Sequence, residues 1–237
     1  MSTHLCPALG PILLYSNTPS PAEAQAIAIV QSRQPCIDRP LRLIVLQTPL
    51  EIPNEREVTT LHNQFSGHGV EVLAMDAGLQ TRGDAHDPEV IAVIRSADIV
   101  LVTGGEPARM ERVIRDTPAL LALQEARAGG VLIGGGSAGA MIFGQGMLDG
   151  PRDSRIPTRM LGWLSNIVVA PHFGNYPIEP WLAAYPTSTF LCLPDEAIAL
   201  VTDNGGRIVS AGNRPLSIID CARGLTPELS SGMTWTR

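Results

Sequence analysis

The stretch Val131-Leu-Ile-Gly-Gly-Gly-Ser-Ala-Gly-Ala140 decides the fold of this chain. It begins with apolar residues typical of a buried strand, and a run of glycines follows them. Gly135-Gly136-Ser137-Ala138-Gly139 matches the pattern G-x-S-x-G, a tight turn from a strand into a helix that exposes a serine hydroxyl. The stretch therefore predicts a strand, a sharp turn at Ser137 and a helix that starts directly after it.

The same glycines allow two other interpretations. Gly134, Gly136 and Gly139 have the spacing of the G-x-G-x-x-G turn that binds dinucleotides, and a glycine cluster also occurs in ordinary turns. The dinucleotide turn usually follows the first strand of its fold, whereas several strand-like segments precede residue 131 here. This position in the chain favours a nucleophilic Ser137 over a nicotinamide site.

Apolar runs and helical patterns alternate through the first two thirds of the chain. Strands are expected at residues 11–15, 41–46, 70–75, 99–102, 131–133 and 167–170. Helices are expected at residues 21–34, 54–65, 88–96, 107–130 (divided at the capping residue Thr117) and about 138–147. This alternation predicts an α/β fold, a three-layer sandwich with a mostly parallel central sheet covered by helices on both faces.

Near the C-terminus, residues 197–220 contain two β runs joined by Asn204-Gly205, which predicts an antiparallel pair at the sheet edge. With 237 residues, 44% of them hydrophobic, the chain can bury one large core. We therefore expect a single α/β domain over residues 1–237, with residues 1–40 and 222–237 peripheral to it.

Composition excludes several kinds of function. The net charge is −6, and all 17 basic residues are arginine, so no lysine is present for a Schiff base or a phosphate loop. The acidic balance argues against nucleic acid as a partner. The four cysteines are scattered without metal or redox spacing. No apolar run approaches the roughly 20 residues needed to span a bilayer, so a cytoplasmic protein without a membrane partner is expected.

Three features follow predicted strands and are expected to share one rim of the sheet, because sites in open α/β folds gather at the carboxyl ends of the strands. Gly104 and Gly105 follow the strand at 99–102, Ser137 follows the strand at 131–133, and His172 follows the strand at 167–170. A reaction at this rim would draw on all three.

A serine hydroxyl becomes a good nucleophile only when a base removes its proton, and imidazole is the usual base near neutral pH. His172 is the only histidine after Ser137 in the chain, which makes it the candidate base. His62, His68 and His86 have no recognisable ligand spacing. We therefore expect no metal and no organic cofactor.

A carboxylate is needed to orient His172 and to stabilise its charged form. Asp153 is the first candidate and Asp149 the second, because both lie in the segment 149–159, which shows no regular pattern and precedes the histidine strand. Glu179 and Glu196 are further candidates. Each of these acids is also compatible with a solvated position in a loop.

The oxyanion of a tetrahedral intermediate needs preset donors, each typically worth ~10²–10³ in rate. The backbone N–H of Ala138 is one natural donor, because it lies at the start of a helix. The N–H of Gly105 is the second candidate, because glycine lets the backbone approach closely. Gly104-Gly105 is equally compatible with a simple turn of the chain.

Five segments of the chain resemble the peptidase E and cyanophycinase family of serine peptidases. They are Val102-Thr-Gly-Gly-Glu106, Gly136-Ser-Ala-Gly-Ala140, Leu161-Gly-Trp-Leu164, Pro171-His-Phe-Gly-Asn175 and Asp195-Glu-Ala-Ile-Ala-Leu-Val201. The similarity runs from about residue 41 to 220, and the pairing of the serine motif with Pro-His-Phe is its most specific part. The resemblance implies a fold like that of the class I glutamine amidotransferases.

The resemblance also implies roles for individual residues: Ser137 as nucleophile, His172 as base, and the amides of Gly105 and Ala138 as the oxyanion hole. Class I glutamine amidotransferases carry cysteine at the turn and glutamate two residues after the histidine, where this chain has Ser137 and Gly174. Ammonia transfer from glutamine is therefore not expected. A true α/β-hydrolase usually places its histidine much further downstream.

One departure from the family bears on the substrate. Family peptidases carry basic residues shortly after the His-Phe pair, whereas the segment Asn175–Pro186 contains no Arg or Lys. The preferences of peptidase E for an N-terminal aspartate and of cyanophycinase for β-aspartyl-arginine are therefore not carried over to this chain.

The sequence thus predicts a serine hydrolase that cleaves an amide bond in a small peptide or related compound through an acyl-enzyme on Ser137. The alternative is a non-catalytic binding or regulatory module that kept the amidotransferase-like fold, and esterase activity on a small ester would use the same residues. The expected partners are a small peptide or amide substrate and, as one option, a second copy of the chain in a homodimer.

Overall fold

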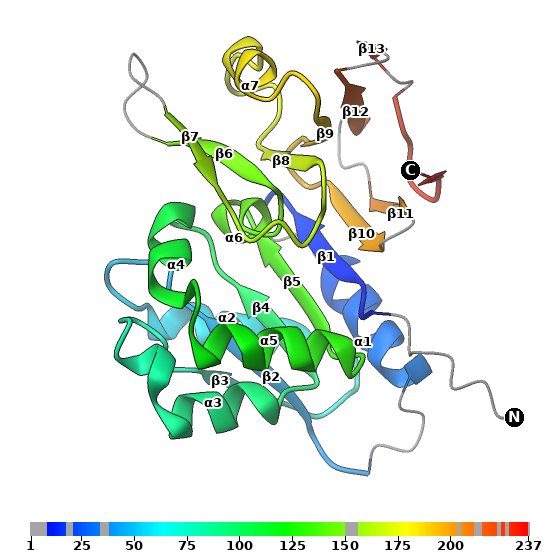
Figure 1. Cartoon of the computed structure of the whole chain (residues 1–237). Coiled ribbons are helices and arrows are strands. Elements are labelled where there is room, and N and C mark those ends of the chain that lie inside the picture. The colour runs from blue at the N-terminus through cyan, green and yellow to red at the C-terminus, as the bar shows by residue number, and fades with distance from the viewer. Residues whose placement is uncertain are drawn as a thin grey trace, which may run out of the picture.

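The computed structural model describes residues 9–17, 21–33, 38–149, 156–202, 205–210, 215–221, 224–225 and 228–236. These residues form two β-sheets and a hairpin, with helices on both faces of the larger sheet (Figure 1). Within them, no helix combines the length and the apolar character that crossing a membrane would require.

The larger sheet, as far as the chain is described, contains eight strands in the order β14-β11-β10-β1-β5-β4-β2-β3. These strands are β1 (Ile12–Tyr15), β2 (Leu41–Leu46), β3 (Val72–Asp76), β4 (Ile99–Val102), β5 (Leu132–Gly136), β10 (Ile198–Thr202), β11 (Gly205–Ser210) and β14 (Thr234–Thr236). The neighbours from β1 to β3 are parallel, whereas β10, β11 and β14 add an antiparallel edge. The predicted mostly parallel sheet and the antiparallel pair at its edge are confirmed.

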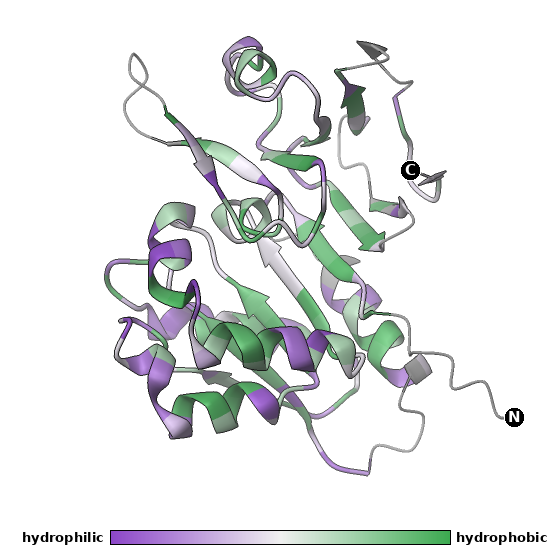
Figure 2. Ribbon diagram, in the orientation of Figure 1, coloured by the Kyte–Doolittle hydropathy of each residue, from purple (hydrophilic) through white to green (hydrophobic). Residues whose placement is uncertain are grey.

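Helices cover both faces of this sheet, as the alternating pattern predicts. One face carries α1 (Pro21–Arg33) and α2 (Glu55–Ser66), and the other carries α3 (Pro88–Arg95), α4 (Pro107–Ile114) and α5 (Pro118–Ala128). Thr117 caps α5 and accepts a hydrogen bond from the N–H of Leu120. Apolar residues follow the central strands, whereas polar residues lie on the outer sides of the helices (Figure 2).

Successive side chains of a strand point to opposite faces of the sheet, so the hydrophobic core has two parts, one on each face. In β1, Leu13 and Tyr15 belong to the hydrophobic cluster under α1 and α2, whereas Ile12 and Leu14 belong to the cluster on the opposite face. All four side chains are at most 6% exposed. Strand β1 is therefore buried on both faces, which explains its continuous apolar sequence.

The smaller sheet, in the described part of the chain, has the strand order β13-β12-β9-β8. It is formed by β8 (Ile167–Pro171), β9 (Thr189–Leu193), β12 (Ser217–Asp220) and β13 (Gly224–Leu225), and the short helix α7 (Glu179–Ala184) precedes β9. Strands β8 and β9 run parallel, with Pro171 opposite Leu193. Their carboxyl ends therefore lie side by side.

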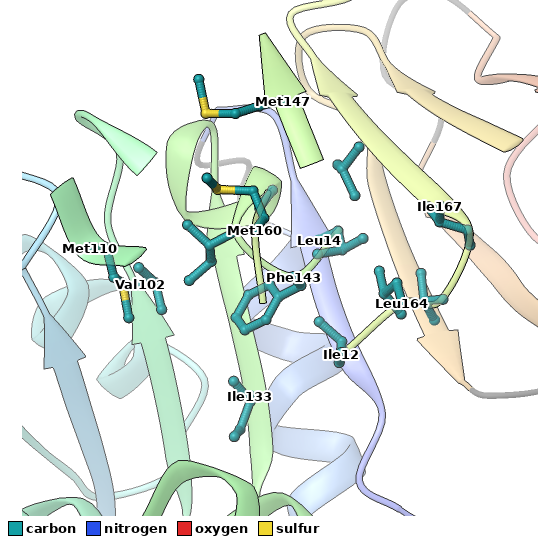
Figure 3. Close-up of a cluster of buried hydrophobic side chains, with 14 of the residues drawn as sticks. Ile12, Leu14, Val102, Met110, Ile133, Phe143, Met147, Met160, Leu164 and Ile167 are labelled. Atoms are coloured by element: carbon teal, nitrogen blue, oxygen red, sulfur yellow. The ribbon is translucent and has the colours of Figure 1, made fainter. Parts of the chain in front are cut away.

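The two sheets are joined by hydrogen bonds between residues 142–145 and 160–167, which we call the sheet joint. The N–H groups of Leu161 and Leu164 donate to the carbonyls of Ile142 and Phe143, and the N–H of Gln145 donates to Ile167. Buried side chains fill the space beside these bonds (Figure 3). They include Ile12, Ile133, Phe143, Met160, Leu164 and Ile167.

Two predicted segments differ from the structure. The helix expected over 138–147 is the single turn α6 (Ala138–Met141), because the backbone after it forms the sheet joint instead of continuing a helical ladder. The segment expected to be irregular, 149–159, supplies the strand β7 (Ile156–Arg159), which pairs antiparallel with β6 (Gly146–Asp149). Residues 150–155 between them lie outside the described residues.

Candidate active site

Four side chains meet where β1, β5, β8 and β9 end. Ser16 follows β1, Ser137 follows β5, His172 follows β8 and Asp195 follows β9. The first two strands belong to the larger sheet and the last two to the smaller one. The site is therefore built at the carboxyl ends of strands, as expected for an open α/β fold, but it draws on both sheets.

Ser137 stands on a strained turn between β5 and α6. Its backbone angles are φ 51° and ψ −118°, in a region that residues other than glycine rarely adopt. A Cβ atom on Gly135 would overlap the backbone of Gly139, and one on Gly139 would overlap the carbonyls of Val102 and Thr103. The glycines are needed because β5, α6 and β4 approach each other too closely for side chains. The serine hydroxyl is therefore exposed at the turn.

The hydroxyl of Ser137 is in hydrogen-bond contact with His172. The distance from Ser137 Oγ to His172 Nε2 is 2.9 Å, which lies within the range expected between a nucleophile and its base. His172 itself has a left-handed backbone, with φ 54°, and its N–H donates to Ser16 Oγ over 2.7 Å. The structure thus brings together the two residues that the sequence singled out.

The other ring nitrogen of His172 contacts a carboxylate. Asp195 Oδ1 lies 2.7 Å from His172 Nδ1, and Asn175 Nδ2 donates to Asp195 Oδ2 over 3.0 Å. The hydrogen bond from His172 is the main cause that lowers the pKa of Asp195, and the bonds from Asn175 and Ser16 act in the same direction against the effect of burial. Asp195 is therefore ionised at neutral pH and can stabilise an imidazolium.

The acid position is a correction to the sequence-based expectation. The carboxylate in contact with His172 Nδ1 is that of Asp195, which was not among the acid candidates. Asp153 lies outside the described residues, and Asp149 is the last residue of β6. The physical reason is the parallel pairing of β8 with β9, which sets the residues after β9 beside those after β8.

Sequence reasoning also missed Ser16. This residue is completely buried, and its Oγ lies 3.2 Å from His172 Nδ1 and 3.3 Å from Asp195 Oδ1. It follows the apolar run of β1, so its place at the carboxyl end of a central strand is the signal that could have identified it. The carboxylates of Glu179 and Glu196, the further acid candidates, form no hydrogen bond or ion pair with His172 in the described structure.

The predicted oxyanion donors lie at the carboxyl ends of β4 and β5, close to Ser137. Gly104 is so close to Ser137 that a Cβ atom on the glycine would lie 3.6 Å from Ser137 Cβ. Gly105 has φ +128° and packs against the backbone of Pro49, which leaves no space for a side chain. Ala138 begins α6, where backbone N–H groups have no intrahelical acceptor. The roles of the Gly105 and Ala138 amides remain predictions.

Within the described part of the chain, the other histidines do not join this site. His62 lies on α2 with Asn63 as its contact, His68 follows that helix, and His86 lies in the single-turn helix η1 (Asp84–His86). Among the described residues, no three His, Cys, Asp or Glu side chains are grouped so that they could hold a metal ion. The chemistry available at the rim is that of a serine, an imidazole and a carboxylate.

A cavity of about 270 Å³ adjoins this constellation. Ser137, His172 and Gly104 line it. Residues of α2 and Tyr15, at the end of β1, line it as well. A small substrate therefore has space directly beside the serine hydroxyl.

The sequence matches the model of a known protein family. The model of peptidase family S51 matches residues 56–209, which include all of the site except Ser16. The chain is 26% identical over 172 residues to the cyanophycinase of Trichormus variabilis, covering 68% of this chain and 56% of that protein. It is 27% identical over 131 residues to the cyanophycinase of Geminocystis herdmanii, covering 51% and 48%. The chain thus spans about half the length of these relatives.

Solved structures agree on the fold. A peptidase from an acI-B1 Actinobacterium superposes with a TM-score of 0.78 at 18% identity, covering 97% of this chain and 98% of the other. A putative peptidase E protein from Listeria monocytogenes gives a TM-score of 0.54 at 16% identity, covering 90% and 99%. At these identities the likeness extends to the fold, and the chemistry must be argued from the site itself.

Proposed function

Because the chain belongs to peptidase family S51, we propose that it is a serine hydrolase that cleaves an amide bond in a small peptide or a related compound. The observation that carries the proposal is the continuous contact from Ser137 Oγ to His172 Nε2, at 2.9 Å, and from His172 Nδ1 to Asp195 Oδ1, at 2.7 Å. Such an order of nucleophile, base and orienting acid is the geometry of a catalytic triad.

In the proposed reaction, His172 Nε2 takes the proton of Ser137 while Oγ attacks the carbonyl carbon of the substrate. The amides of Gly105 and Ala138 donate hydrogen bonds to the oxyanion that forms. His172 then gives the proton to the leaving amine, and the acyl group stays on Ser137. A water molecule, activated by the same imidazole, releases the acid and restores the serine.

Asp195 has two tasks in this scheme. It holds His172 with Nε2 facing the serine, and its negative charge stabilises the imidazolium during both steps. The lowered pKa of Asp195 supports this role, because it keeps the carboxylate charged at neutral pH. Asn175 Nδ2 holds the second carboxylate oxygen in place.

The same contacts weigh against the alternative of a binding module without turnover. A module that had lost catalysis would have no reason to keep a serine on a strained backbone, 2.9 Å from an imidazole that is itself backed by a carboxylate. The relatives named cyanophycinase are longer proteins, so the substrate of this chain is proposed only as a class: short peptides and related amides.

Labelling with a fluorophosphonate tests the nucleophile. We expect the folded wild type to be labelled at Ser137, and both Ser137→Ala and heat-unfolded protein to remain unlabelled. A library of dipeptides then tests turnover, with hydrolysis expected in the wild type and abolished in Ser137→Ala. Equal labelling of wild type and Ser137→Ala would show that the assignment of the nucleophile is wrong.

A further inference from the structure

Another cavity, of about 460 Å³, adjoins the sheet joint, and we call it the joint cavity. The described residues that line it include Gln145, Arg159, Gly162, Ser165, Asn166 and Tyr185. Asn166 directly precedes β8, whereas His172 directly follows it, and the five residues of that strand span about 17 Å. The joint cavity is therefore remote from the candidate active site. Its volume lies within the range of small-molecule sites, about 300–1,000 Å³.

The joint cavity is built on hydrogen bonds that hold the two sheets together. The N–H of Gln145 donates to Ile167 over 2.7 Å, and the carbonyl of Gln145 accepts from the N–H of Met160 over 3.0 Å. The side-chain amide of Gln145 donates to the buried hydroxyl of Ser188, which directly precedes β9. A ligand in the cavity would therefore contact residues that connect the larger sheet to β8 and β9.

The hairpin of β6 and β7 also reaches the joint cavity, and it lies beside β8 and α7 (Figure 1). Pro157 and Arg159 of β7 line the cavity. The hydroxyl of Tyr185 contacts the carbonyl of Met147 in β6 at 2.7 Å and that of Thr158 in β7 at 3.2 Å. A single small molecule could thus contact the hairpin, the sheet joint and the segment before β9 together.

The polar groups of the joint cavity favour a negatively charged ligand. Arg159 is exposed, and its guanidinium forms no hydrogen bond or ion pair within the described residues. Ser165 and Asn166 add a hydroxyl and an amide, and both of these groups can donate. No Asp or Glu is among the described residues that line the cavity, although the whole chain is acidic. The cavity thus offers a positive charge and hydrogen-bond donors.

A carboxylate fits these groups, because its two oxygens accept paired hydrogen bonds from a guanidinium. Pro157 and the ring of Tyr185 add apolar surface to the lining. We propose that the joint cavity binds a small carboxylate with an apolar body, and that this ligand stabilises the sheet joint. Since the joint connects the sheets that carry Ser137 and His172, the ligand is an effector of the hydrolysis, and this consequence alone rests on the proposed function.

NMR titrations of the whole chain test the site with sodium benzoate and with benzamide, a neutral molecule of nearly the same shape. At constant ionic strength, we expect benzoate to bind at least about fivefold more tightly, as for a favourable exposed charge pair. The largest shifts are expected at the backbone amides of Gly162, Ser165 and Asn166. Equal affinities of the two molecules, or shifts confined to Gly136 and Ser137, would refute the site.

Two variants assign the preference for benzoate to particular residues. Arg159→Gln is expected to abolish it, whereas Arg42→Gln, which changes an exposed arginine of β2 outside the cavity lining, leaves it intact. Asn166→Asp keeps the size of the side chain and adds a negative charge, so benzoate should bind more weakly. Aspartate also tolerates the left-handed backbone at this position, φ 59°. Equal effects of Arg159→Gln and Arg42→Gln would overturn the proposal.

Amide hydrogen exchange measures the effect on the sheet joint directly. Benzoate at ten times its Kd is expected to slow the exchange of the Gln145, Leu161 and Leu164 amides by about tenfold, if the loosened joint does not bind it. Amides of β2 serve as the control. Unchanged exchange in the joint with benzoate bound would refute the stabilising role. If a fluorophosphonate does not label Ser137, the proposed function fails, while the titrations and the exchange rates still decide on the site.

Discussion

At the scale of single residues, Asp195 is proposed both to orient His172 and to stabilise its charged form. We expect Asp195→Asn to lower kcat by roughly 10³–10⁴-fold, because an amide neither fixes the ring tautomer nor stabilises the imidazolium. Steady-state kinetics and the rate of fluorophosphonate labelling measure this loss. The matched control is Glu196→Gln, since Glu196 is exposed and its backbone N–H, not its side chain, contacts Asn17. Equal effects of the two variants would contradict the assignment of Asp195.

Ser16 acts through His172, so it is a positioning residue. Ser16→Ala removes the acceptor of the His172 N–H and leaves that group without its partner, at a cost of about 1–3 kcal/mol in stability. We expect kcat to fall by about tenfold or more while KM stays nearly unchanged, because the fully buried hydroxyl contacts His172 and Asp195. A change confined to thermal stability, with kcat intact, would limit Ser16 to a structural role.

The sequence singled out Ser137 and His172 but not Asp195, and the reason lies in how each position is marked in the sequence. Ser137 is marked by glycines in its own turn, and His172 by a strand directly before it. Asp195 is 23 residues beyond His172 and becomes its neighbour only through the pairing of β8 with β9. A contact that depends on strand pairing has no local signature in the chain.

At the scale of elements, the turn at Ser137 depends on the close approach of β5, α6 and β4. Gly135→Ala would place a methyl group into the backbone of Gly139, and we expect a destabilisation of about 1–3 kcal/mol together with slower labelling of Ser137. Gly83→Ala is the control, because Gly83 has φ −62° and an added Cβ there would meet only Thr81 Oγ1 at 3.4 Å. Thermal unfolding measures both; equal stability of the two variants would count against the packing argument.

Elements that depend on local patterns were predicted well, and those that depend on neighbours were not. The strand β2 and the cap of α5 at Thr117 have the predicted positions, because alternation and capping act within a few residues. The helix after Ser137 stops at Met141, where the backbone finds partners in the sheet joint. Tertiary hydrogen bonds therefore override the helical pattern of residues 142–147.

At the scale of the whole molecule, the buried Glu23 makes stability depend on pH. Burial is the main cause that raises its pKa above the ordinary value of 4.5. The stability associated with the protonated carboxyl is complete below pH 4.5 and is lost as the pH rises through the raised pKa of the folded state. We expect Glu23→Gln to increase the melting temperature relative to the wild type more at pH 8 than at pH 4.

Melting temperatures of both proteins at the two pH values check this prediction. Glu89→Gln is the matched control, because Glu89 also lies in the first turn of a helix, α3, but is exposed. If Glu23→Gln shifts the melting temperature equally at pH 4 and pH 8, the carboxyl does not carry the pH dependence.

The division of the molecule into two sheets is the largest feature that the sequence did not predict. The strands at 41–46, 99–102 and 131–133 suggest one parallel sheet, and nothing in the pattern of β8 or β9 distinguishes a strand of a second sheet. The single domain, the cytoplasmic location and the homodimer remain predictions. The sequence could still place Ser137 and His172 at one rim, because the strands that precede them in the two sheets end at the same place.

Because the site spans two sheets, its geometry depends on the sheet joint that connects them. Ser137 is carried by the larger sheet, and His172 and Asp195 by the smaller, so a slip of about 1 Å between them would break the 2.9 Å contact while leaving each sheet intact. Loss of the proposed activity is then expected to precede unfolding. We therefore expect solutes that loosen residues 142–145 and 160–167 to reduce the proposed activity before the secondary structure is lost.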